Sequence, residues 1–283
     1  MNVHVSDFNE LVKEELGYRE CDRFHATELV LQAFDADVSG GKIRKEEIDK
    51  IKEHPDAVSV TIFGLTQETF EYFIDNYARQ FKYIRFFKNK AVKDWSKLST
   101  LPNLEFLYWF VNQKIDRLWD MSANHALKAV ELNDFTRLHD LSGIEKAKAL
   151  EWFGFGNEVW PAAEVDSLNI LKDTGIKRLD FYGKTIKDMD ISFLPEMKKL
   201  ESFNFAPNLF TTEQVAWIAA KCPDLKGKAI KPYIKFSSCD EKTENKAVIV
   251  GKRKPILDFE GNEKRIEKYT LEFDRLVEKF RCE

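Results

Sequence analysis

An apolar pattern of nearly fixed spacing recurs through the middle of this 283-residue chain. Seven segments carry apolar residues at their first, fourth and sixth positions, and successive segments begin 23 to 26 residues apart. The first positions are Ala57, Phe81, Leu104, Leu127, Leu150, Ile176 and Leu200. Self-similarity at such a period is typical of an array whose units must stack on one another to bury their apolar sides. The spacing therefore predicts a stacked repeat.

Within each repeat, the apolar residues at positions four and six are separated by one residue, as in a strand with one buried face. Positions three, five and seven then point to the opposite face. Position nine is Asn in three repeats, at Asn89, Asn112 and Asn208, where its side chain would bond to the backbone of the turn. The other four repeats lack this Asn and have Leu65, Phe135, Glu158 and Lys184.

These seven segments resemble the leucine-rich-repeat family, of an intracellular bacterial type, over residues 57–226 or about 60% of the chain. The resemblance implies an α/β fold, a right-handed solenoid shaped like a horseshoe. A parallel β-sheet would form its concave face, and helical and irregular return segments would form its convex face. The Phe-rich core, with 23 Phe in the chain, departs from the usual Leu-rich pattern.

The return segments between strands differ in kind. Thr66–Phe81 opens with a capping-box-like sequence and has helical periodicity. Glu164–Asp173 and Thr211–Lys221 are also expected to be helical, whereas Val92–Leu104 is expected to be a short irregular return.

Each end of a stacked array needs a cap, because its last unit would otherwise expose the core. Residues 1–56 are expected to form a helical N-terminal cap, with helices over Ser6–Leu16, His25–Ala33 and Arg44–Glu53. An alternative is that one end carries a binding site.

Residues 227–283 are expected to form a C-terminal cap of short strands and one helix. The strands are predicted over Lys231–Phe236, Ala247–Gly251 and Ile256–Phe259, and the helix over Gly261–Lys279. Four residues of this helix fall on one apolar face, namely Ile266, Tyr269, Phe273 and Leu276.

The concave face is the candidate binding surface for an unidentified protein partner. Strands lie about 4.8 Å apart, so aromatic residues at positions three, five and seven of neighbouring repeats should touch. A contiguous apolar patch flanked by charges is typical of an interface centre. The predicted partner-binding residues are Phe63, Tyr83, Arg85, Phe87, Phe106, Tyr108, Phe110, Glu131, Trp152, Arg178, Asp180 and Tyr182. Gly154 and Gly156 are expected to leave a hollow beside Trp152.

Two other uses of this face stay open. The N- or C-terminal segment could fold over it and bury the aromatic residues within the chain, or the face could mediate self-association. The oligomeric state is not determined by the sequence.

Residues 35–46 resemble a calcium-binding EF-hand loop, in which oxygen ligands at fixed places surround the ion. Asp35, Asp37, Ser39 and Glu46 occupy ligand places, but Lys42 stands where an apolar residue is expected. A calcium-responsive regulator is therefore the alternative function. The competing interpretation is an acidic turn that leads into a helix.

Composition and motifs exclude several other classes. The net charge of −4 and the pI near 5.9 argue against a nucleic-acid-binding surface. No run of 18 apolar residues exists, so we expect no membrane span, and the four Cys form no disulfide or zinc pattern. Met1–Asn9 has no apolar signal core, which favours a cytoplasmic location.

No enzyme motif accompanies the repeat. The five His show no metalloprotease spacing, and no phosphate-binding or nucleophile-elbow sequence is present. His139 and Asp140 are expected to be a solvated surface pair. We therefore expect a non-enzymatic protein without a cofactor.

Overall fold

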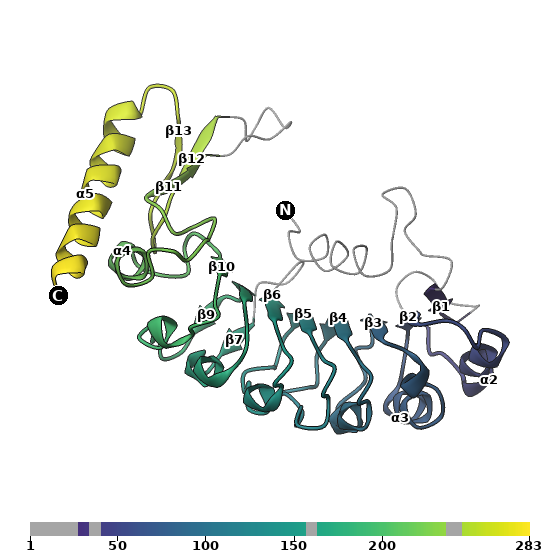
Figure 1. The fold of residues 1–283 in the computed structure, drawn as a ribbon. Helices are drawn as coiled ribbons and strands as arrows, with labels where there is room; N and C mark the ends of the chain where they lie inside the picture. Colours follow the sequence, from purple (N-terminus) through teal and green to yellow (C-terminus); the bar gives the residue numbers. More distant parts are fainter. Residues whose placement is uncertain (1–27, 34–40, 157–162, 236–244) are drawn as a thin grey trace.

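The computed structural model describes residues 28–33, 41–156, 163–235 and 245–283. These residues form a mixed α/β fold built on a parallel sheet of eight strands, which follow one another in sequence order (Figure 1). The strands are β1 (Glu28–Leu31), β2 (Ser59–Phe63), β3 (Tyr83–Phe87), β4 (Phe106–Asn112), β5 (Ala129–Phe135), β6 (Trp152–Gly156), β8 (Arg178–Tyr182) and β10 (Ser202–Phe205).

All seven repeat segments form strands, and each strand begins at position three of its repeat. Neighbouring strands pair position for position, so that Ile84 lies beside Leu107 and Phe86 beside Trp109. The same register continues from β2 to β10. Because no strand is shifted against the next, every apolar residue at positions four and six reaches the same face of the sheet.

The return segments cover that face and lie below the row of strands in Figure 1. Helix α3 (Gln67–Asn76) starts at a capping box in which Thr66 and Thr69 each accept a bond from the other's backbone N–H. Helix α4 (Thr212–Lys221) starts in the same way at Thr211. The irregular return after β3 contains one 3₁₀ turn, Ser96–Thr100. Three of these expectations from sequence are therefore confirmed.

Two predicted helices are wrong. Within His25–Ala33, the described residues form strand β1, which pairs in parallel with β2 and adds an eighth strand to the sheet. Within Glu164–Asp173, the chain forms the two-residue strand β7 (Glu164–Val165) and a 3₁₀ turn. Strand β7 pairs with β9 (Thr185–Ile186), and this pairing holds the backbone of the segment extended at its start.

The N-terminal end otherwise follows expectation where it is described. Helix α2 (Lys45–Ile48) continues into a 3₁₀ helix, Asp49–Glu53. The predicted helix Ser6–Leu16 lies outside the described residues.

The inner face of the sheet packs against the returns as one continuous core, and the residues at positions four and six are all at most 2% exposed. Trp109 is central to it, because its ring contacts Phe86 at 4.3 Å, Trp95 at 5.5 Å and Phe70 at 5.9 Å between centroids. Large rings thus fill the layer between sheet and returns where shorter aliphatic side chains would leave voids.

Asn at position nine ties consecutive repeats together where it is buried. Asn112 donates to the carbonyls of Asn89 and Val92 and accepts from the backbone N–H groups of Lys114 and Ile115. Its amide therefore satisfies four backbone groups that the turn leaves without partners. Asn208, in the last repeat, is exposed, so only part of the predicted Asn role is confirmed.

The chain turns in the left-handed region at position eight of four consecutive repeats. The φ angles are 69° at Gly64, 58° at Lys88, 67° at Val111 and 57° at Asp134. A Cβ at Gly64 would lie 2.0 Å from the carbonyl oxygen of Gly41, so this turn accepts only glycine, which has no side chain.

A separate small unit closes the C-terminal end. It contains an antiparallel sheet of β11 (Tyr233–Lys235), β12 (Lys246–Ile249) and β13 (Ile256–Asp258), followed by helix α5 (Glu263–Cys282). Helix α5 packs against α4 and joins the unit to the repeats (Figure 1). Its buried face carries Ile266, Phe273 and Val277, while Tyr269 and Leu276 are half-buried, so the predicted strands, helix and apolar side are confirmed.

In the described part of the chain, every helix is too short or too polar to cross a bilayer.

Candidate functional site: the aromatic face

The residues at positions three, five and seven form what we call the aromatic face, the face of the sheet turned away from the return segments. Its apolar centre is a cluster separate from the main core. All twelve predicted partner-binding residues belong to strands β2 to β8 and lie on this face. The predicted alternation of faces therefore brings them together as expected.

Aromatic rings form two rows across neighbouring strands. At position seven, Phe63 lies 5.0 Å from Phe87, and Phe87 lies 4.7 Å from Phe110, between centroids. At position three, Tyr83 stacks on Phe106 at 4.9 Å. These separations are in the favourable range for aromatic pairs. The rows arise because identical positions of adjacent repeats are paired directly.

Guanidinium groups lie over two of the rings. Arg85 lies 5.5 Å from the ring centroid of Tyr108, and Arg178 lies 4.8 Å from that of Trp152. Such contacts attract the cation to the electron-rich ring face. The aromatic face is thus a mixture of rings and charges.

The aromatic face is less accessible than the sequence suggested. Seven of the twelve predicted residues are buried, each at most 7% exposed, namely Tyr83, Phe106, Tyr108, Phe110, Glu131, Trp152 and Asp180. The other five are half-buried, namely Phe63, Arg85, Phe87, Arg178 and Tyr182. The expectation of an exposed apolar patch is therefore corrected, because the centre of the face is packed and only its margin reaches solvent.

A buried carboxylate organises the end of the face formed by β6, β8 and β10. Asp180 accepts hydrogen bonds from the Trp152 indole at 2.7 Å, the Arg178 guanidinium at 2.7 Å and the Asn204 amide at 2.8 Å. Asp180 is fully buried, so these three donors replace the water that the carboxylate loses. Asn204 was not among the predicted site residues, although its place beside Asp180 at position five was a usable signal.

The expected hollow beside Trp152 is filled at Gly154. A Cβ at Gly154 would lie 3.0 Å from Cγ of Glu131, whose side chain occupies this space. Glu131 is fully buried and accepts a hydrogen bond from the amide of Asn133 at 3.0 Å. The small residue therefore makes room for a carboxylate of the same chain, which corrects the predicted hollow. Gly156, at the end of β6, is also buried.

The prediction that a terminal segment covers the aromatic face concerns both ends of the chain. The described C-terminal unit packs on α4, and no residue after Trp152 belongs to the apolar cluster of the aromatic face as far as the chain is described. The N-terminal segment considered for the same role lies in residues 1–27, outside the described residues.

Most of the calcium hypothesis concerns residues that are not described. Asp35, Asp37 and Ser39 lie in the range 34–40, and Glu46 is an exposed residue of α2. Among the described residues, no three His, Cys, Asp or Glu side chains gather in a way that would hold a metal ion. The hypothesis thus stays an expectation from sequence.

His139 pairs with a different carboxylate from the one expected. Its Nδ1 lies 2.7 Å from Oδ2 of Asp166, and Lys187 donates to the other oxygen of Asp166 at 2.6 Å. Hydrogen bonds from Lys187 and His139 lower the pKa of the Asp166 carboxyl. Both His139 and Asp166 are about half exposed, which agrees with a solvated surface pair but not with Asp140 as the partner.

Comparison with known proteins gives a similarity to a solved structure. No family model and no curated protein matches the chain. Among solved structures, the chain is similar to an internalin from Listeria monocytogenes, with 20% identity and a TM-score of 0.48. The match covers 60% of this chain and 46% of the internalin chain. At this level of similarity, membership of the leucine-rich-repeat family stays an interpretation of the sequence.

Proposed function

We propose that the chain is a non-enzymatic module that binds another protein through the aromatic face. The observation that carries this proposal is the row of rings at position seven, Phe63, Phe87 and Phe110, which runs across three strands beside the cations Arg85 and Lys88. Aromatic side chains and Arg are the residues most enriched where protein interfaces hold their binding energy.

Burial adds a condition to this proposal. A partner meets the half-buried margin first, at Phe63, Phe87 and Tyr182. It reaches the buried centre only if the chain opens this face. The free energy of that opening is then subtracted from the binding free energy, so the measured affinity falls with the fraction of open chain.

The test is affinity capture of a partner, followed by purification of that partner and measurement of its affinity. We compare the wild type with a margin variant, Phe63→Ser, Phe87→Ser and Tyr182→Ser. The control variant, Lys148→Ser and Lys198→Ser, removes two exposed side chains from the return segments, outside both the aromatic face and the C-terminal unit. The margin variant is expected to lose at least about 2 kcal/mol of binding free energy, the usual threshold for dominant contacts, and the control variant to bind normally.

Equal binding by the wild type and a correctly folded margin variant would contradict the proposal. Loss of binding in the control variant alone would move the partner to the return segments. Hydrogen exchange of the wild-type complex gives an independent readout, because binding at the aromatic face should slow exchange in β2 and β3.

A further inference from the structure

The C-terminal unit differs from the rest of the chain in charge. Residues 227–283 carry 14 Lys and Arg against 11 Asp and Glu, whereas residues 1–226 carry 30 against 37. The unit also holds both large apolar side chains that are exposed in the described structure, Ile256 at 65% and Leu271 at 50%. The C-terminal unit is therefore slightly basic in an otherwise acidic chain, and it carries exposed apolar groups.

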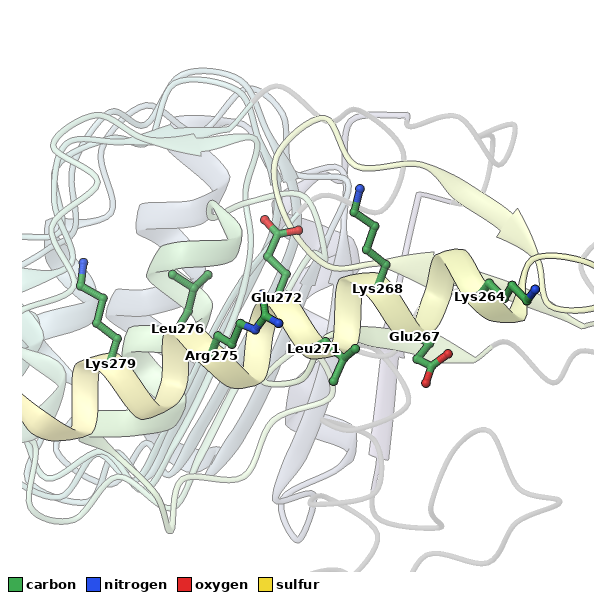
Figure 2. A pocket seen from close by; sticks show the side chains of 8 residues that line it. All are labelled: Lys264, Glu267, Lys268, Leu271, Glu272, Arg275, Leu276 and Lys279. Carbon is green, nitrogen blue, oxygen red and sulfur yellow. The ribbon is translucent and has the colours of Figure 1, made fainter.

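Basic side chains gather on one side of α5, next to Leu271. The spacings of four, seven and four residues place Lys264, Lys268, Arg275 and Lys279 on one face of the helix. Together with Leu271 and other residues of α5, they line an open hollow of about 670 Å³ (Figure 2). In this view, Lys268 and Lys279 extend to one side of the helix and Leu271 to the other.

Three of these cations have no carboxylate partner in the described part of the chain, namely Lys264, Lys268 and Arg275. Two acidic residues nearby pair with other cations, since Glu272 lies 3.8 Å from Lys254 and Glu283 lies 3.7 Å from Lys279. Glu267 also lines the hollow, and Figure 2 shows it on the same side of the helix as Leu271. The whole helix carries six cations and five carboxylates, so the excess of positive charge in α5 is small and local to this one face.

An apolar recess adjoins this hollow. It has a volume of about 280 Å³ and lies between α5 and the small sheet. Its lining combines the apolar groups of Tyr233, Phe259, Ile266 and Leu271 with two carboxylates and a hydroxyl, from Glu263, Glu267 and Thr270. Leu271 and Glu267 line both hollows. The recess is large enough to receive one apolar side chain from outside.

We infer that α5 is a second docking surface, and that its ligand is an acidic segment of another protein with one large apolar side chain. The apolar side chain enters the recess at Leu271, and Asp or Glu residues on one side of the segment pair with Lys264, Lys268 and Arg275. Amphipathic recognition of this kind combines an apolar anchor with complementary charge.

A membrane surface fits this geometry less well. A helix that binds a bilayer inserts a continuous apolar face. Leu271 is the single large apolar side chain that the described part of α5 exposes to more than a third, and its apolar neighbour is a recess. A second copy of the chain could supply acidic residues from its first 220 positions, so it is one outcome of the test.

The experiment selects peptides from a random 12-residue display library on the full-length protein and measures their affinity by fluorescence anisotropy. Enriched peptides are expected to be rich in Asp and Glu, with one large apolar residue. The variant Lys264→Glu, Lys268→Glu and Arg275→Glu should raise their Kd at least about tenfold. Leu271→Asn should also weaken binding, and it tests the apolar anchor because it leaves the net charge of the stripe unchanged.

The matched control is Lys42→Glu, Lys90→Glu and Lys93→Glu, which reverses three exposed charges far along the chain from α5 and should leave the Kd unchanged. The inference is overturned if no peptide is enriched, if the enriched peptides are not acidic, or if the α5 variant binds them as well as the control does.

Two further outcomes would also overturn it by naming another ligand. Co-sedimentation with phosphatidylserine vesicles that depends on the same three cations, without peptide binding, would assign the surface to a membrane. A dimer in sedimentation equilibrium that the α5 variant abolishes would assign it to a second copy of the chain.

Discussion

The two faces of the eight-stranded sheet share one backbone but carry different kinds of side chain. At positions four and six, the inner face holds apolar side chains alone, and all of them are buried. At positions three, five and seven, the aromatic face combines rings with two fully buried carboxylates, Glu131 and Asp180. Apolar burial has no directional requirement. A buried carboxylate, in contrast, depends on particular donor atoms.

Because of this difference, substitutions on the two faces should destabilise the protein for different reasons. On the inner face, a substitution that removes side-chain volume should lower stability, and a substitution by an apolar side chain of similar size should be tolerated. The aromatic face should respond to the loss of a single hydrogen-bonding atom, even when the shape of the side chain is kept.

The largest expected effect is on the inner face. Trp109→Ala should lower the free energy of unfolding by about 3–5 kcal/mol, because it opens a cavity among the rings of Phe86, Trp95 and Phe70. Urea denaturation followed by circular dichroism measures this change. Trp109→Phe should cost clearly less, and an equal cost for both variants would argue against a volume effect.

The next effect concerns the aromatic face. Asp180→Ala should cost about 2–3 kcal/mol, because the Trp152, Arg178 and Asn204 donors lose their acceptor while Arg178 can still reach water. Asp180→Asn keeps the shape and one oxygen, and it should still destabilise the protein measurably. If Asp180→Asn proved neutral in the same urea titration, the proposed contrast between the faces would not hold.

The smallest expected effect concerns Glu105, which immediately precedes β4 and belongs to neither face. Glu105 accepts hydrogen bonds from Lys128 at 2.9 Å and pairs with Lys82 at 3.0 Å. Burial raises the pKa of the Glu105 carboxyl, but the hydrogen bonds from Lys128 and Lys82 outweigh burial and leave the pKa below its ordinary value. Both Lys side chains are about half exposed, so Glu105→Gln should cost less than about 1 kcal/mol at neutral pH.

The pH dependence of this effect has a definite sign. A carboxyl whose pKa is lowered by folding stabilises the native state above its unfolded pKa, which is about 4.3 for Glu. That contribution is lost as the pH falls through the lower folded value. The wild type and Glu105→Gln should therefore differ at pH 7 and converge in strongly acidic buffer. A difference that grows on acidification would show that the pairing with Lys is not its cause.

The local pattern of apolar residues in the sequence was sufficient to predict the inner face, since the strand starts and the apolar positions follow directly from the repeat. It was insufficient for Glu28–Leu31, whose apolar residues also fit helical spacing, and which is a strand because β2 offers it an edge to pair with. It was also insufficient for the two-residue strand β7, which depends on its distant partner β9.

The candidate site shows the same limit. The residues that meet on the aromatic face were predicted from alternation, because alternation is a property of each strand. Their burial was not predicted, because burial depends on contacts between parts of the chain that are far apart in sequence. The Asp180 network depends on a pairing register that becomes certain only when the strands are assembled.

The charge at position two of the repeats has a period of two repeats, whereas the strands have a period of one. From the second repeat onward this position alternates in charge, through Lys82, Glu105, Lys128, Glu151, Lys177 and Glu201. Deletion of the repeat that begins at Leu127 would place Glu105 beside Glu151, two like charges, whereas deletion of two repeats would place Glu105 beside Lys177. The natural unit for lengthening or shortening this protein, in the laboratory or by gene duplication, is therefore the pair of repeats.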